Sequence, residues 1–242
     1  PVGVSFVQET TVFREFGPVS GNTMRFGYQY APSVGTMFLG KQTLDADARY
    51  YKRIGETGVF AVRGRGFKSY GQFPDFVYFG GNSEMRGYEY LEFIGHKGGF
   101  FNAELRFPLV EAMLTPIGVL GGIRGTFFFN AGGASLNGQP FTFFSRDAET
   151  YNPTIGYAFD PETGNFAPVG GPPVTVSGFR LMNGRASYGL GLTTSLIGIP
   201  FHFDWSWPTL FNREWEDVLF ASQGGSDAFR QSRFDFWMGY DF

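Results

Sequence analysis

Cysteine is absent from the 242 residues of this chain, which excludes a disulfide framework and metal sites built from thiolates. Long apolar runs are missing too: no stretch approaches the roughly 18 residues of a membrane-spanning helix, and the mean hydropathy is −0.12. The net charge of −3 gives no sign of a nucleic-acid partner. No signal peptide opens the chain, as expected of a mature exported protein or of part of a longer one.

Residues suited to catalysis are also few. The chain has only two histidines, His96 and His202. His202 alternates with Asp204 and Ser206 along one expected strand, where such residues point the same way but spread over roughly 13 Å. That spacing does not build a contact between a nucleophile and its base. No metal-ligand spacing or nucleotide-binding fingerprint is found, so we expect no enzyme, no metal and no cofactor.

Aromatic residues and glycine are abundant instead. Aromatics make up 19% of the chain, with 31 Phe, and there are 36 Gly, an excess that is unusual for a soluble domain. This composition suits strands with aromatic faces joined by tight turns. It fits a soluble all-β protein, and it also fits a transmembrane β-barrel, whose apolar residues come at every second position.

Alternation of apolar and polar residues predicts about nine strands. They are expected at about 4–13, 24–30, 44–51, 60–65, 100–107, 123–132, 185–193, 199–207 and 233–242. The pattern is clearest in the last of these, RFDFWMGYDF. There one face is expected to carry the apolar residues Phe234, Phe236, Met238, Tyr240 and Phe242.

The polar faces of these strands carry charges of both signs, among them Arg63, Glu104, Arg124 and Asp204. Such side chains can pair at little cost in a water-filled lumen, whereas each would cost a few kcal/mol facing lipid near the midplane. The apolar faces must therefore point outward. The predicted fold class is all-β, a transmembrane antiparallel β-barrel rather than a soluble sandwich, located in the bacterial outer membrane with lipid as a partner.

The lengths of the expected connections support this reading. Counted back from the C-terminal end, every second connection is long, at about 208–232, 135–183, 70–99 and 32–42, and those between are shorter. Long loops on one side and short turns on the other are typical of outer-membrane barrels. We expect residues 1–242 to form one barrel portion, with long external loops at about 70–99, 135–183 and 208–232.

One of these loops contains the segment GGNSEMRGYEY, with Arg86, Gly87 and Tyr88 in sequence. After it, the segment NAELRFPL carries Glu104. The next expected strand has an aromatic residue, an amide and a glycine at alternate positions, namely Phe128, Asn130 and Gly132. Over roughly 58–242, these motifs in this order, together with the aromatic Phe242, resemble the outer-membrane assembly-factor superfamily typified by BamA and TamA.

The resemblance implies that the Arg86 loop folds back into the barrel lumen. Alternation independently places Glu104, Phe128, Asn130 and Gly132 on the inner wall, where a guanidinium would need a carboxylate and a further acceptor. Gly87 would let the backbone turn tightly. The family has an aspartate where this chain has Asn130, an amide that accepts a hydrogen bond but supplies no charge, so the latch is expected to be weaker.

Barrels of that superfamily have sixteen strands, of which about nine are expected here. An open sheet would leave unpaired edges in lipid, so an upstream segment or another chain is expected to complete the barrel. The resemblance implies insertion or export of client outer-membrane or secreted proteins, by strand pairing at a lateral seam with the strand at 233–242 as one lip. The alternative is a passive anchor or pore that serves a partner or a further domain.

Overall fold

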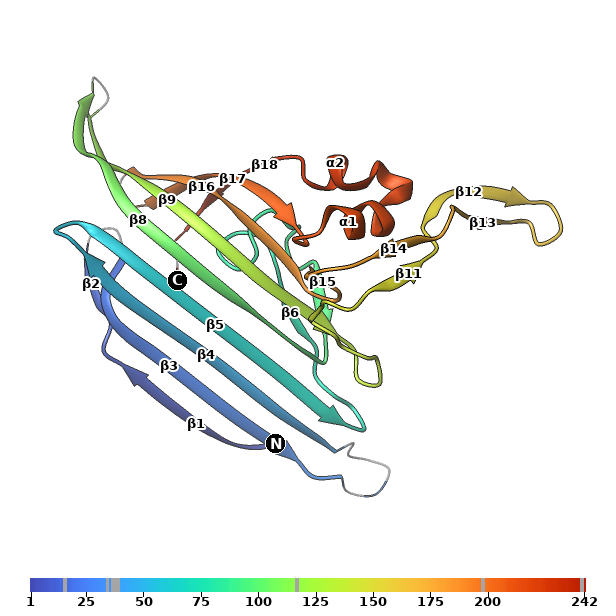
Figure 1. Cartoon of the computed structure of the whole chain (residues 1–242). Coiled ribbons are helices and arrows are strands. Elements are labelled where there is room, and N and C mark those ends of the chain that lie inside the picture. Colours follow the sequence, from blue (N-terminus) through green and yellow to red (C-terminus); the bar gives the residue numbers. More distant parts are fainter. Residues whose placement is uncertain (15–16, 34, 36–39, 116–117, 197–198, 240–241) are drawn as a thin grey trace.

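A large antiparallel sheet dominates the computed structural model, which describes residues 1–14, 17–33, 35, 40–115, 118–196, 199–239 and 242 (Figure 1). The predicted all-β class is confirmed. Neighbouring strands in the sheet follow the chain order. They are β1 (Val2–Glu9), β3 (Gly17–Ala31), β4 (Lys41–Ile54), β5 (Gly58–Gly71), β8 (Lys97–Thr115), β9 (Gly118–Ser135), β16 (Arg185–Leu196), β17 (Ile199–Thr209) and β18 (Arg233–Met238), and the short β2 (Val12–Arg14) pairs with β3.

The strand expected at 4–13 is two strands, because β1 ends at Glu9 and β2 begins at Val12, each pairing with a different part of β3. Most other strands extend beyond the alternating core that predicted them. The longest pair, β8 with β9, remains in register from Lys97 opposite Ser135 to Pro108 opposite Arg124 before a register shift. Among the described residues β1 and β18 are not paired with each other, so the sheet of this chain is open.

The two faces of the sheet differ in character. One, called here the outer face, exposes aromatic and aliphatic side chains, with Phe127 51% and Tyr188 50% exposed. The other, the inner face, carries charged and amide side chains such as Asn102 and Asp204, which are buried because the loop between β5 and β8 folds against them. Alternation predicted this division, because successive side chains on a strand point to opposite faces.

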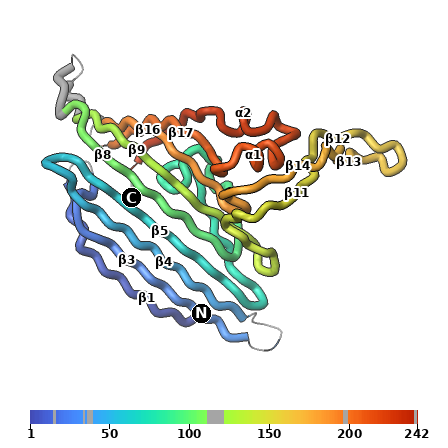
Figure 2. Tube along the Cα trace, in the orientation of Figure 1, coloured from blue at the N-terminus to red at the C-terminus, as the bar shows by residue number. Residues whose placement is uncertain are grey.

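The long connections at about 70–99, 135–183 and 208–232 are folded rather than irregular (Figure 2), whereas the one expected at 32–42 lies partly outside the described residues. Residues 70–99 contain the pair β6 (Val77–Phe79) and β7 (Phe93–Gly95). Residues 135–183 contain three two-stranded ladders: β10 (Phe144–Ser145) with β15 (Arg180–Leu181), β11 (Glu149–Tyr151) with β14 (Val174–Val176), and β12 (Thr154–Asp160) with β13 (Asn165–Gly170). The hairpin β12–β13 projects away from the rest of the chain.

Among the described residues, helical structure is confined to the connection between β17 and β18, which holds α1 (Arg213–Leu219), a 3-10 turn (Ala221–Gln223) and α2 (Gly225–Phe229). Asn212 begins α1 by accepting a hydrogen bond from the backbone N–H of Trp215, as an N-cap does. Trp215 in turn packs against Val176 and Leu181 of the preceding connection. No helix in the described part of the chain is long and apolar enough to cross a membrane.

The last strand ends earlier than its alternation predicts. β18 stops at Met238, and Gly239 follows with a φ of +144°, which a residue with a side chain rarely adopts. Phe234, Phe236 and Met238 are exposed on the outer face, but Phe242 is 4% exposed and packs with Tyr51, Val59 and Ala61. The expected place of Phe242 on the outer face is therefore wrong, because the chain leaves the strand at Gly239. The fifth residue of that predicted face, Tyr240, lies outside the described residues.

Candidate functional site

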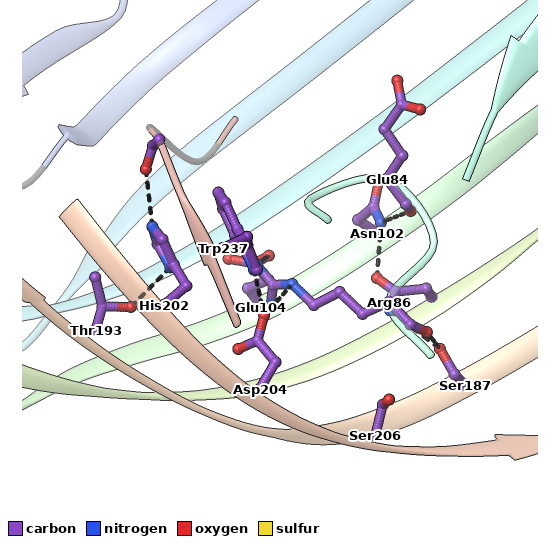
Figure 3. A network of polar contacts seen from close by, with 12 residues as sticks. Glu84, Arg86, Asn102, Glu104, Ser187, Thr193, His202, Asp204, Ser206 and Trp237 are labelled. Carbon is purple, nitrogen blue, oxygen red and sulfur yellow. Dashed lines mark hydrogen bonds and ion pairs between the residues drawn. The ribbon is translucent and has the colours of Figure 1, made fainter. Parts of the chain in front are cut away.

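The loop that carries the Arg-Gly-Tyr segment lies against the inner face of the sheet. Its turn begins at Gly80 and Gly81, which have φ values of +135° and +69°. Met85 is completely buried in a cluster with Val77, Phe79, Tyr88, Phe93 and Phe100. These apolar contacts fasten the loop to β6, β7 and β8, and they direct the next residue, Arg86, toward the polar side chains of the sheet (Figure 3).

Arg86 is 2% exposed and lies between two carboxylates from strands far apart in the sheet. Its Nη2 is 2.8 Å from Oε1 of Glu104 on β8, and its Nε is 3.3 Å from Oδ2 of Asp204 on β17. The guanidinium also lies over the ring of Phe128, 4.6 Å from the centroid, a cation–π contact. One loop side chain therefore bridges β8, β9 and β17.

Glu104 is shared between two guanidinium groups. Its Oε2 accepts from Nε of Arg106 at 2.7 Å, while its Oε1 faces Arg86. Glu104 thus pairs at the same time with its strand neighbour Arg106 and with the loop residue Arg86. Removing one member of a buried ion pair leaves an uncompensated charge, which typically costs about 3–5 kcal/mol. The arrangement consequently holds the loop strongly in place.

Gly87 and Tyr88 are fixed by β16 and β17. Gly87 has a φ of +85°, and a Cβ there would lie 2.7 Å from Oγ of Ser206. The Tyr88 hydroxyl donates to the carbonyl of Ala186 at 2.8 Å, and burial raises the pKa of this phenol well above its usual value. The phenol therefore stays neutral and remains a hydrogen-bond donor, so all three residues of the segment contact the sheet.

Asn130 belongs to a neutral network next to Arg86. Its Oδ1 accepts from Asn102 Nδ2 at 2.7 Å, and its Nδ2 donates to Ser187 Oγ at 3.2 Å. Asn102 also donates to the backbone carbonyl of Glu84 at 2.5 Å, and Ser187 donates to that of Arg86. The amide thus supports the backbone of the loop on either side of Met85.

Gly132 leaves space for the same loop. A Cβ at Gly132 would lie 3.0 Å from Sδ of Met85 and 2.8 Å from Cβ of Phe100. The structure thus brings Arg86, Glu104 and Phe128 into direct contact, and places Asn130 and Gly132 around them. The closing-strand residues Phe234, Phe236 and Met238 face the other side of the sheet, and Phe242 lies on the inner side in its own cluster.

Sequence reasoning missed Asp204, Ser187 and Trp237 as parts of this site. The alternation of His202, Asp204 and Ser206 does place them on the inner face. Nothing in the sequence indicated that the loop, more than 100 residues earlier, would reach them. His202 is a buried hydrogen-bonding residue between Thr193 and the carbonyl of Gly239.

The ion pairs and hydrogen bonds of this arrangement suit a mechanical role. Both carboxylates face guanidinium groups, and the Thr193 hydroxyl next to His202 belongs to a buried set of bonds that reaches the carbonyl of Gly239. Within the described ranges, no three His, Asp or Glu side chains are grouped so that they could hold a metal ion. What the site can do is hold one loop inside a curved sheet, across strands β8 to β17.

Comparison with known proteins agrees with the order of these motifs. No curated protein matches the chain significantly. A family model described as the Omp85 superfamily domain matches residues 12–242, which is nearly the whole chain. The match includes the loop with Arg86, the inner-face residues that receive it and the closing strand, all of which the sequence motifs had related to BamA and TamA. This chain belongs to the Omp85 superfamily.

Proposed function

We propose that this chain is the C-terminal part of an outer-membrane β-barrel that assists the insertion or export of other proteins by strand pairing at a lateral seam. Membership of the Omp85 superfamily supports a protein of the outer-membrane assembly and translocation type. Proteins of this kind are typically assembly or transport factors, not enzymes.

The observation that carries the proposal is the difference between the two faces of the open sheet. Side chains such as Phe127, Leu190 and Phe236 are 45–52% exposed on the outer face, where lipid would cover them. Charged residues gather on the inner face instead, where Arg63 pairs with Asp47 at 2.8 Å. In a membrane every strand edge must also be paired, so the sheet requires further strands to close.

The edges of the sheet provide the means of strand pairing. All eight residues of β1 are exposed, and β18 at the other end of the sheet pairs with β17 over only six residue pairs. A strand edge with unpaired backbone groups is a template for another strand. In the proposal β18 forms one lip of the seam, the completing segment forms the other, and a client strand adds between them.

Arg86 has a structural or gating role in this proposal. Its two carboxylate partners and the buried cluster around Met85 hold the loop in the lumen and preserve the curvature of β8 to β17. The ladders in residues 135–183 and the helices between β17 and β18 would then stand outside the membrane, as the long external connections.

Disulfide crosslinking tests the seam directly, because the chain has no cysteine of its own. Phe236→Cys on β18 would be expressed in the full-length protein in native membranes, with a model outer-membrane barrel that carries one cysteine in its last strand. We expect an adduct during assembly of the model client. Leu190→Cys is the matched control, since it is similarly exposed but lies on β16, which has partners on both edges.

Equal adducts at positions 236 and 190, or none at 236, would contradict the seam.

One feature favours the second candidate, a passive anchor or pore. The external connections fold together around Trp215, whose indole N–H donates to the carbonyl of Leu181 at 2.7 Å. An ordered external surface of this kind suits contact with a partner. A seam that never forms a client adduct would favour that function.

A further inference from the structure

We propose that Asp204 couples the Arg86 loop to β18, so that the loop holds the closing strand in place from inside. This inference deepens the proposed function and rests on it in one respect, the role of β18 as a lip of the seam. It adds a regulatory connection: the position of the loop would decide how firmly β18 is held against β17 while the free edge of β18 pairs with another strand. The residues that carry the connection are Asp204 and Trp237.

A single oxygen atom joins the loop to the strand. Oδ2 of Asp204 is 3.3 Å from Nε of Arg86, and the same atom accepts a hydrogen bond from the indole N–H of Trp237 at 2.8 Å. The guanidinium of Arg86 also lies 5.9 Å from the centroid of the Trp237 ring. The carboxylate of Asp204 packs directly against Gly191, where a Cβ would lie 2.4 Å from Oδ1.

The whole inner side of β18 faces the loop. Arg233 forms an ion pair with Glu89. Asp235, two residues on, lies near the backbone N–H of Gly87. Trp237, two residues further, meets Arg86 through Asp204. Alternate residues along β18 therefore contact successive parts of residues 86–89, in a strand that is joined to the sheet by six residue pairs.

Trp237 also connects Asp204 to the end of β18, through His202. The ring of His202 stacks on it at 3.7 Å between centroids and 4° between planes. The Nε2 of His202 lies 2.9 Å from the carbonyl oxygen of Gly239, where the chain turns inward, and its Nδ1 lies 3.0 Å from Oγ1 of Thr193 on β16. A shift of Trp237 would disturb both contacts.

Because residue 130 is Asn, the second ion pair of Arg86 is with β17 and not with β9. Without a carboxylate at position 130, the second negative charge next to Arg86 comes from Asp204 on β17, the strand beside β18, rather than from β9 in the middle of the sheet. The expectation of a weaker latch at Asn130 therefore overlooked a second carboxylate.

A second link joins the Arg86 site to the residue Phe242. Arg106 shares Glu104 with Arg86, and it donates a hydrogen bond to the carbonyl oxygen of Phe242 at 3.1 Å.

Amide hydrogen exchange of the full chain in lipid nanodiscs, without client, tests the coupling. Asp204→Asn keeps the size of the side chain but removes its charge. We expect residues 233–239 to exchange at least about tenfold faster, because hydrogen bonds to charged groups are among the stronger ones. Residues 80–90 should also exchange faster. The matched control is Asp47→Asn, which removes an inner-face carboxylate paired with Arg49 on β4 and Arg63 on β5 and should leave both segments unchanged.

Trp237→Phe gives an independent measurement and retains every charge, so it remains decisive if Asp204→Asn does not fold. It removes the indole N–H but leaves a ring for His202. Because coupling between two sites is reciprocal, this change on β18 should accelerate exchange in the loop at 80–90 as well as in 233–239. The double variant should be no faster than the more affected single variant, since both remove the same connection.

For either variant, faster exchange in only one of the two segments, or in neither, would overturn the proposal, and so would additive effects of Asp204→Asn and Trp237→Phe. The measurement is separate from the crosslinking test of the seam. Coupled exchange without a client adduct would leave the inner support of β18 standing and reject strand pairing. A client adduct without coupled exchange would support strand pairing and reject the inner support of β18.

Discussion

At the scale of single residues, glycine is required at position 87 both by the backbone conformation and by the neighbouring side chains. Its φ of +85° disfavours any residue with a side chain, and Ser206 and Ser187 occupy the space where a Cβ would go. The neighbouring Arg86 is constrained in another way, by charge. Its guanidinium is balanced by Glu104 and Asp204 in a region closed to solvent.

Gly87→Ala is therefore expected to destabilise the folded protein by at least about 2 kcal/mol, the combined effect of backbone strain and overpacking. The midpoint of urea unfolding in detergent, followed by the gel mobility of the unheated protein, measures this. Gly64→Ala on β5 is the matched control. Its φ is unexceptional and nothing lies within 4 Å of the added methyl group, so a similar loss there would contradict the explanation.

At the scale of elements, the connection between β17 and β18 is organised around one buried carboxylate. Glu216 of α1 is completely buried, and its Oε1 accepts from the backbone N–H of Leu210 at 2.6 Å. Its Oε2 accepts from Nε of Arg230 at 2.5 Å, a bond that raises the pKa of Arg230 and keeps that guanidinium charged. Glu216 thus ties both ends of the helical segment together.

Glu216→Gln should loosen this segment without affecting the sheet. Losing the charge from these bonds is expected to cost roughly 1–3 kcal/mol locally, which corresponds to about a tenfold or greater increase in cleavage within 208–232 during limited proteolysis. The control is Glu214→Gln, the same change on the exposed side of α1. If both variants are cut at the same rate, the buried carboxylate does not organise the segment.

At the scale of the whole molecule, the sidedness of the sheet determines what its environment has to be. Exposed aromatic side chains cover the outer face, whereas ion pairs and amides occupy the inner one. In water such an outer face would be a large apolar patch, which marks an interaction surface. In the proposed function a bilayer would supply the apolar surroundings of this face.

Phe127→Arg, near the middle of β9, is accordingly expected to destabilise the protein folded in lipid vesicles by about 2–4 kcal/mol, the cost of an arginine facing lipid near the midplane. Titration with urea in the presence of vesicles measures it. Gln29→Arg on β3 introduces the same charge on the inner side of the sheet and should change stability little. Equal losses for the two variants would show that lipid does not cover the outer face.

Much of the fold followed from alternation, because the side-chain period of a strand is a local property. In this way we could predict the two faces of the sheet and the inner position of Glu104 and Asn130. The strand positions also predicted that every second connection is long. The ladders within 135–183 could not, since their strands are short and irregular in pattern. Phe242 was misplaced because alternation continues through Tyr240, while the backbone turns at Gly239.

Local patterns in the sequence therefore predicted the all-β class, the two unlike faces, the family motifs with Arg86 in a loop and the inner position of its partner Glu104. The other side chains that meet Arg86 depend on the tertiary structure. Its second carboxylate, Asp204, comes from a strand more than 100 residues away, and that carboxylate also holds Trp237. A local pattern states which way a side chain points, but its partner depends on where the loop folds back and which strands curve around it.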